Sequence, residues 1–303
     1  MFLKRLFRLF PFLVAIGITV LTNPPKMPAD DVGAAVDAFD RNLGVERLDP
    51  DGAEGNGEPG TLPPEKRRLP RDSAVLNKQS SLSDLDEAIR LNPNSATAYN
   101  NRGRAYQRLK DYNRALADYA QAILLNPNYA AVYNNRGNVY LGQKEYDKAL
   151  SDFNTAIRLN PNSVHAYNNR GNLYLEKKEY DKALSDYNEA VRLNPTYALA
   201  YISRGRLYRQ ERNRQEALSD YNQAIRLKPN SALAYNNRGN VYLDEKQYDK
   251  ALSDYNQAIR LDPTLALAYR NRGKTYKAKG EQQKAAADLA KAEELGSEIG
   301  SSP

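Results

Sequence analysis

Few side chains in this sequence could perform covalent or metal chemistry. The 303 residues contain no Cys and a single His, His165. Without Cys there can be no disulfide, no thiolate metal site and no Cys nucleophile. One His cannot form a pair of His ligands, and any His-based triad would depend on that one residue. We therefore predict no catalytic residue, no metal site and no cofactor, and expect binding chemistry instead.

Asn, Arg and Tyr, which can bind without reacting, recur at a fixed spacing. Tyr-Asn-Asn-Arg-Gly, or a close variant, begins at six Tyr residues that lie 34 positions apart: Tyr99, Tyr133, Tyr167, Tyr201, Tyr235 and Tyr269. Taking Ala96 as the first residue gives six units, numbered here 1 to 6: 96–129, 130–163, 164–197, 198–231, 232–265 and 266–299. All 22 Tyr of the sequence fall inside them.

The spacing within a unit predicts two helices that position these side chains. Apolar and aromatic residues recur every three or four positions, first from Ala96 to about Leu109 and again from about Tyr112 to Leu125. Asn126-Pro127 should end the second helix, because Pro lacks the amide proton and disfavours helical geometry in the residue before it. Three Ser residues are predicted N-caps of the helices that follow them: Ser95, Ser163 and Ser231. The Gly of each unit, such as Gly103, should allow the two helices to approach closely.

These residues resemble the tetratricopeptide repeat, whose unit is 34 residues long. The resemblance rests on Tyr99, Gly103, Tyr106, Ala115, Tyr119, Ala122 and Pro127 and their counterparts, and residues 83–94 resemble the second helix of a further unit. It implies an all-α fold, a right-handed superhelical α-solenoid whose concave groove is lined by the first helices. It also implies a non-enzymatic scaffold that binds other proteins. The predicted organisation is an N-terminal hydrophobic segment (1–22), a disordered linker (23–79), a half-repeat (80–95), six repeats (96–299) and a tail (300–303).

Two positions depart from the family pattern together. The seventh residue of every unit is Arg and the twenty-third is Asp, where the family more often has apolar or aromatic residues. We expect ion pairs in which each Arg reaches the Asp of the preceding unit, so that Arg102 would meet Asp84 and Arg136 would meet Asp118.

The resemblance places Asn residues along the groove. An amide can donate to a peptide C=O and accept from an N–H without reading side chains, which suits an extended peptide segment. The alternative is that some of these Asn bond across the helix pair and only order the superhelix. Lys is missing at the positions where chaperone-binding relatives hold a terminal carboxylate, so a chaperone co-factor role is disfavoured. The predicted groove amides are Asn101, Asn135, Asn138, Asn169, Asn172, Asn237, Asn240 and Asn271.

Unit 4 breaks the pattern. Its first helix and the turn after it carry five Arg, of which Arg206 and Arg209 are expected to point into the groove. An acidic segment of a partner or a phosphate group could dock there through charge-assisted hydrogen bonds. The alternative is a solvated basic turn.

The N-terminus carries three basic residues followed by an uncharged, mostly apolar run from Leu9 to Thr22. This pattern predicts a secretory signal or an uncleaved signal-anchor, and the alternatives stay open because no clear cleavage site follows. Basic residues before the run would stay in the cytoplasm and place the array on the extracytoplasmic side, attached to the membrane through this segment. The next residues, 23–79, are rich in Pro, Gly and acids and predict a linker that does not fold.

Other proteins are the expected partners, and no small-molecule substrate is expected. Residues 1–95 carry 12 basic and 14 acidic residues, which leaves 32 basic and 23 acidic residues for 96–303, a net charge of +9. This basic array raises RNA as an alternative partner. We disfavour it because the Tyr are accounted for by the repeat core and leave none for base stacking. A second alternative is an assembly or regulatory subunit that docks on an enzyme or membrane complex through the convex face.

Overall fold

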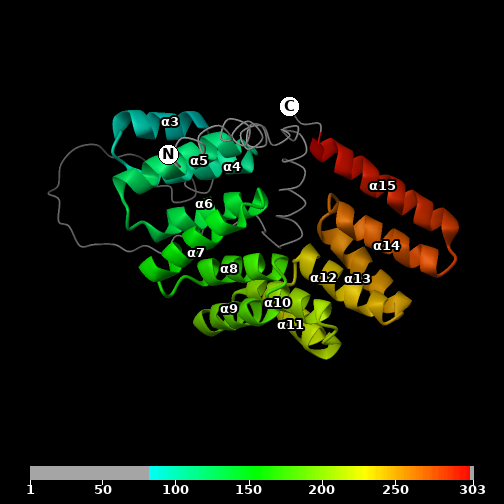
Figure 1. Cartoon of the computed structure of the whole chain (residues 1–303). Helices are drawn as coiled ribbons and strands as arrows, with labels where there is room; N and C mark the ends of the chain where they lie inside the picture. The colour runs from blue at the N-terminus through cyan, green and yellow to red at the C-terminus, as the bar shows by residue number, and fades with distance from the viewer. Residues whose placement is uncertain (1–81, 301–303) are drawn as a thin grey trace, which may run out of the picture.

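The computed structural model describes residues 82–300, which form helices joined by short turns and, within that range, no strand (Figure 1). Each unit supplies two helices, as predicted from its periodicity, and one further helix precedes unit 1. The helices are α3 (Leu82–Leu91), α4 (Ala96–Arg108), α5 (Tyr112–Leu125), α6 (Ala130–Gly142), α7 (Tyr146–Leu159), α8 (Val164–Glu176), α9 (Tyr180–Leu193), α10 (Ala198–Gln210), α11 (Arg214–Leu227), α12 (Ala232–Asp244), α13 (Tyr248–Leu261), α14 (Ala266–Ala278) and α15 (Gln282–Gly300).

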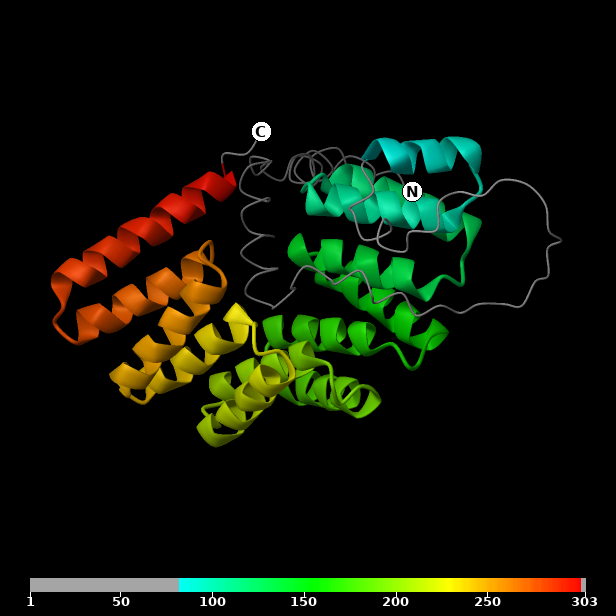
Figure 2. The same ribbon diagram turned by 180° about the vertical axis from the view of Figure 1, so that it is seen from behind.

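The array bends into an arc with α3 and α15 at its two ends, both at the top of Figure 1 and again in the reverse view of Figure 2. Each helix packs against the next one, and the first helices of successive units also contact one another. The second helices of successive units, α5 to α13, make no such contact with one another. The first helices therefore lie on the tighter, inner side of the arc, and we call the surface they form the inner face. The predicted all-α solenoid is confirmed.

Local chemistry sets the ends of these helices. The hydroxyls of the three predicted Ser caps accept hydrogen bonds from backbone amides three residues later, at 3.2 Å from Ala98 N to Ser95 Oγ in α4. The second helices end where predicted, with Asn126 the C-cap of α5 just before Pro127. Between the two helices of units 1 to 5 the chain turns through a Lys or Arg with positive φ, such as Lys110 at 63°. In unit 6 this residue is Gly280, which adopts a φ of 83° without steric cost.

The core runs along the array as a stack of small and aromatic side chains. In unit 3, Ala183, Tyr187 and Ala190 are fully buried, and their counterparts are buried in the same way from unit 1 to unit 5. A Cβ added to Gly171 would lie 2.7 Å from Cε1 of Tyr187, closer than carbon atoms can pack. The predicted close approach at the Gly is therefore confirmed, and it is the aromatic ring of the second helix that fills the space.

The described residues end at 300. In the portion from 82 to 300, the helices are either too short or too polar to cross a bilayer. The predicted hydrophobic segment (1–22) and linker (23–79) lie outside the described residues.

Candidate functional site

The conserved spacing of Arg and Asp produces ion pairs within each unit, so the predicted register is wrong. Arg136 donates from Nε and Nη2 to both carboxylate oxygens of Asp152 at 2.8 Å, and does not reach Asp118. Asp118 instead accepts both bonds from Arg102 of its own unit. The reason is geometric: the two helices of a unit are antiparallel and in direct contact, which brings its seventh and twenty-third positions together. The Asp side chains are 6 to 9 % exposed, so these are largely buried pairs.

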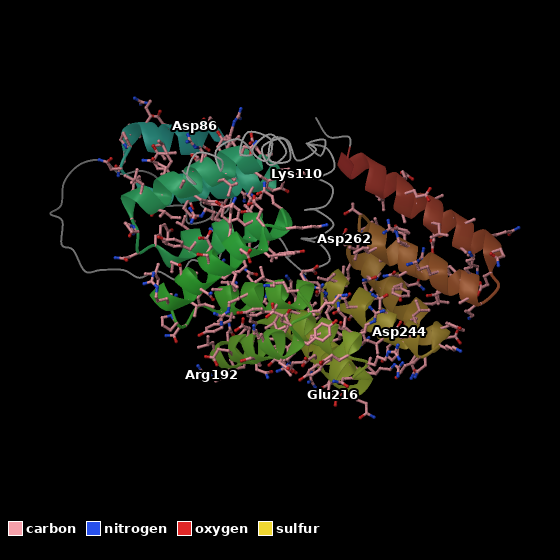
Figure 3. All side chains as sticks on the ribbon, in the orientation of Figure 1. Asp86, Lys110, Arg192, Glu216, Asp244 and Asp262 are labelled. Carbon is pink, nitrogen blue, oxygen red and sulfur yellow. The ribbon has the colours of Figure 1, made fainter. Side chains whose placement is uncertain are left out.

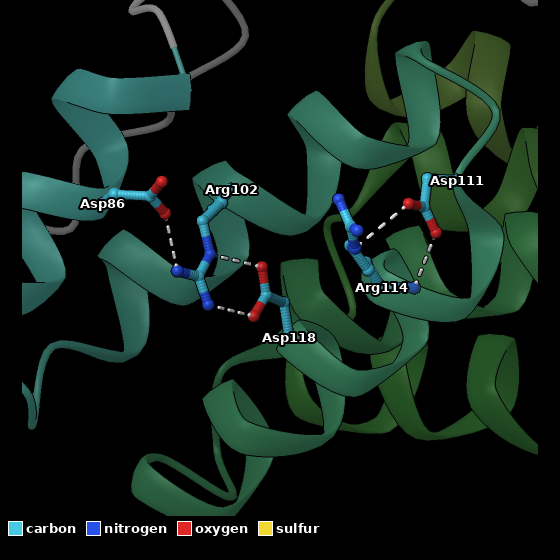
Figure 4. Close-up of polar contacts among 5 residues, drawn as sticks. All are labelled: Asp86, Arg102, Asp111, Arg114 and Asp118. Carbon is cyan, nitrogen blue, oxygen red and sulfur yellow. Dashed lines mark hydrogen bonds and ion pairs between the residues drawn. The ribbon is translucent and has the colours of Figure 1, made fainter.

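The same Arg also joins neighbouring units through its third nitrogen. Arg102 Nη1 donates to Asp86 on α3 at 2.7 Å, and Figure 4 shows the guanidinium held between Asp86 and Asp118. Four later units repeat this bond with an Asn sixteen residues before the Arg: Asn154, Asn188, Asn222 and Asn256. Unit 2 is the exception, since Ala120 occupies this place. The expected contact with the preceding unit thus exists, but through a different acceptor.

The inner face is held together by pairs of Asn amides. The sixth residue of one unit donates to the fifth residue of the unit before it, from Asn135 Nδ2 to Asn100 Oδ1 at 2.9 Å and from Asn169 to Asn134 at 3.0 Å. Asn271 donates to Asn236 in the same way. We call this row the Asn ladder. These bonds order the superhelix, but they join the first helices of neighbouring units and do not cross the helix pair of one unit.

The other predicted groove amides differ in exposure. Asn172 and Asn240 accept from the hydroxyls of Tyr187 and Tyr255 in their own units, and Asn172 is only 1 % exposed. Asn138 is partly exposed and Asn101 is exposed. Asn135, Asn169 and Asn237 are each 9 % exposed, so only a small part of each faces outward.

In unit 4, Ile202 and Ser203 replace the two Asn of the ladder. Asn168 of unit 3 is fully buried, and neither its Nδ2 nor its Oδ1 has a partner. Ser203 Oγ and Asn237 Nδ2 are likewise buried without a partner. The ladder is therefore interrupted on both sides of α10.

The two arginines predicted to line the groove of unit 4 have different surroundings. Arg209 donates to Asp244 of α12 at 2.7 and 3.2 Å, which neutralises it (Asp244 is labelled in Figure 3). Arg206 is partly exposed, makes no ion pair among the described residues, and has a buried Nη1 without a partner. Arg206 and Ser203 thus lie on one face of α10. The charge of Arg209 is balanced by Asp244, whereas the charge of Arg206 is not balanced by a described residue.

The remaining reactive side chain belongs to the packing. His165 Nδ1 lies 3.1 Å from the hydroxyl of Tyr197, and the two rings meet edge to face. Over the described range, no group of acidic or His side chains has the arrangement of a metal site.

Sequence reasoning missed the acceptors of these contacts. Asp244 and the Asn that receive Arg Nη1 look like ordinary polar surface residues in one unit. When the six units are aligned, Asn recurs in units 2 to 5 at the position that receives Arg Nη1. Asp244 lies in unit 5, directly after unit 4, which is the one unit with Arg at its twelfth position. The sequence shows that Ile202 and Ser203 depart from the Asn-Asn pattern. It does not show that Asn168 thereby loses its partner, because that partner lies in the next unit.

Comparisons with known proteins agree with this architecture. Family models described as "Tetratricopeptide repeat" match residues 77–131, 100–164 and 134–198, and those described as "TPR repeat" match 205–246 and 239–280. Among curated proteins, no sequence matches the chain.

Solved structures share the fold. The chain superposes on the crystal structure of the APC/C hetero-tetramer Cut9–Hcn1 with a TM-score of 0.66 and 19 % identity, over 75 % of this chain and 47 % of that one, so it spans about half its length. A tetratricopeptide repeat protein from Parabacteroides merdae gives 0.60 with 27 % identity, over 71 % of this chain and 86 % of that one. Pseudomonas aeruginosa PilF gives 0.55 with 19 % identity, over 67 % and 90 %.

Proposed function

The chain belongs to the tetratricopeptide repeat family, and from this premise we propose that it is a scaffold that binds extended segments of other proteins along its inner face. The observation that supports the proposal is the continuous inner surface built by the first helices of six units, lined by amide and Arg side chains. A peptide lying across several units would meet a polar side chain at the ninth position of each, an Asn in units 2, 3 and 5 and a basic residue in units 1, 4 and 6. No part of the proposed activity needs a reacting group.

The Asn ladder changes which residues would contact a partner. Amides that bond to one another have little capacity left for a ligand, and each hydrogen bond contributes only about 1 kcal/mol net. Contact with a partner is therefore expected at the more exposed polar positions, such as Asn101, Asn138, Arg206 and Lys274. Asn135 and Asn169 would act by holding neighbouring units in register.

Photo-crosslinking separates this function from docking through the convex face. A photo-reactive amino acid is placed at Asn101 or Asn138 on first helices, and, as matched controls, at the exposed Ser151 or Ser185 on second helices. The full-length protein is irradiated in its own cells, and crosslinked partners are identified by mass spectrometry. Inner-face binding predicts a partner captured from Asn101 and Asn138 but not from the two Ser positions. Capture from the Ser positions alone would favour the assembly-subunit alternative.

We also propose an extracytoplasmic location for the array. The support is sequence alone: Lys4, Arg5 and Arg8 precede the apolar run from Leu9 to Thr22. Reporter fusions after residue 80 test it, because alkaline phosphatase is active only outside the cytoplasm and a fluorescent cytoplasmic reporter only inside. Activity of the cytoplasmic reporter would contradict the proposal, and cell fractionation would show whether the protein stays with the membrane.

A further inference from the structure

Unit 4 concentrates unsatisfied polar groups on the inner side of the array. Of the eight buried side-chain atoms without a partner among the described residues, six lie on α10 or on residues packed against it. They belong to Asn168, Ser203, Arg206, Tyr221 and Asn237. A buried polar atom without a partner costs about 1–3 kcal/mol, so a cluster of them in one place is an expensive arrangement for packing alone.

The other units show which residue at the ninth position would avoid this cost. Asn occupies the ninth position in units 2, 3 and 5, and in units 3 and 5 it accepts the hydroxyl of the Tyr below it. Unit 4 has Arg206 there, which can only donate, so the hydroxyl of Tyr221 has no acceptor. The positive charge of Arg206 acts on Tyr187 and Tyr221, lowering the pKa of both phenols against the larger rise caused by burial.

The other arginines of this unit cannot replace Arg206. Arg204 is paired with Asp220, and Arg209 with Asp244. Arg212 is exposed in the turn, and Arg214 and Arg226 are exposed on the second helix, α11. Arg206 is the one guanidinium of unit 4 that faces the inner side without an anionic partner among the described residues.

The unpartnered atoms of this cluster that can donate are Arg206 Nη1, the Nδ2 atoms of Asn168 and Asn237 and the hydroxyls of Ser203 and Tyr221, and one atom, Asn168 Oδ1, can only accept. Donors surrounding a single positive charge match an acceptor that carries a single negative charge. A carboxylate meets this description, and its two oxygens can accept the paired N–H groups of Arg. A phosphate dianion would need a second cation, and Arg209 is already neutralised.

We propose that the inner face of unit 4 is a carboxylate-binding site in which Arg206 binds an Asp or Glu side chain of the bound peptide segment. The proposal rests on the scaffold function above and specifies where along the array a partner is fixed. Ser203 and the amides of Asn168 and Asn237 are buried beside the site, so their side chains would have to rotate outward to reach the ligand.

The repeat itself supplies the test variant. Arg206→Asn places in unit 4 the residue found in units 2, 3 and 5, so the protein should fold and Tyr221 should gain an acceptor. The matched control is Arg214→Gln, which removes one exposed positive charge of the same unit outside the site. The probes are three fluorescent octapeptides of alternating Gly with Glu, Gln or Lys, titrated against the full-length protein to about 1 mM and followed by fluorescence anisotropy.

The wild-type protein should bind the Glu peptide at least about tenfold more tightly than the Gln peptide, because a charge-assisted pair replaces a neutral one. Arg206→Asn should remove this preference and raise the melting temperature, while Arg214→Gln should retain the preference. Binding of the Glu peptide should also shift the Arg Nε–Hε NMR resonance that is missing from the Arg206→Asn spectrum.

Equal binding of the three peptides, unaffected by Arg206→Asn, would overturn the carboxylate site and leave the scaffold function standing. A Glu preference that survives in Arg206→Asn and is lost in Arg214→Gln would assign the effect to general surface charge and would also overturn it. If none of the peptides binds, the carboxylate site is rejected, and the crosslinking experiment decides the scaffold function separately.

Discussion

At the scale of single residues, the structure separates Tyr side chains that look equivalent in the sequence. Tyr187 and Tyr221 occupy the same position of adjacent units, and both are fully buried. Tyr187 donates to Asn172 at 2.9 Å, whereas the hydroxyl of Tyr221 has no partner. Unit 2 has Phe153 at this place, which shows that the fold accepts the ring without a hydroxyl.

Replacing the two Tyr by Phe should therefore have opposite effects. Tyr221→Phe removes an unsatisfied hydroxyl and should raise the free energy of unfolding by about 1 kcal/mol. Tyr187→Phe leaves Asn172 without its partner and should lower it by about 1–3 kcal/mol. Chemical denaturation of both variants measures the difference, and equal effects would show that the hydroxyl of Tyr221 is satisfied in solution.

Burial of these phenols also predicts how stability depends on pH. Burial raises the pKa of Tyr187 and Tyr221 well above their ordinary value of 10.0. A group with a raised pKa in the folded state contributes fully below its unfolded pKa, and the contribution is lost as pH rises toward the folded value. The free energy of unfolding should therefore fall above pH of about 10. The fall should be smaller in Tyr221→Phe, and an unchanged slope would contradict the assignment.

At the scale of the helix pair, ion pairs take the place of apolar contacts. Arg136 and Asp152 join α6 to α7, and the guanidinium also lies 5.8 Å from the ring centroids of Tyr133 and Tyr140. The hydrogen bond to Asp152 raises the pKa of Arg136, so the guanidinium stays charged under all ordinary conditions. Arg136 is the simplest case to measure because Ala120 gives it no acceptor in unit 1.

A mutant cycle on this pair should show strong compensation. Arg136→Leu leaves a buried carboxylate unpaired and should cost about 3 kcal/mol or more of unfolding free energy. The double variant Arg136→Leu/Asp152→Ala removes both charges and should recover most of that loss. Additive losses in the double variant would mean that the two side chains do not interact.

At the scale of the whole molecule, the joints between units are unequal. The joint between units 2 and 3 has both an Asn bond of the ladder and an Arg Nη1 bond. The joint between units 1 and 2 lacks the Arg bond, and the joint between units 3 and 4 lacks the Asn bond. The joint between units 4 and 5 replaces the missing Asn bond with the pair of Arg209 and Asp244. Because stability in a repeat array is approximately a sum of unit and neighbour terms, these differences should be measurable joint by joint.

Repairing one joint should strengthen the array. Ser203→Asn restores the residue found in the other five units and lets it donate to Asn168, as Asn169 does to Asn134. We expect an increase of about 1 kcal/mol in the free energy of unfolding and slower hydrogen exchange in α8 and α10. Ser219→Asn, an exposed position on α11, is the control and should change neither quantity.

The fold could be predicted from the sequence because the same pattern of residues recurs in six units. Tyr, Gly, Ala and Pro recur in phase, so helix bounds and the close packing at Gly171 followed from one unit. The partners of Arg136 and Asn135 did not follow, because sequence spacing alone does not say whether a side chain reaches across its own helix pair or to the next one. The sequence also could not show that Arg206 lacks an anionic partner while Arg209 has one. Arg209 pairs with Asp244, which lies 35 residues away in the next unit.

The differences between the joints have a genetic consequence. Where a joint uses only residues that every standard unit carries, a copy of a unit can be gained or lost by recombination without creating a mismatched neighbour. The pair of Arg209 and Asp244 disfavours this between units 4 and 5, since each residue would then face a unit that lacks its counterpart. Natural variation in the length of this array should therefore leave units 4 and 5 adjacent and occur elsewhere along the chain.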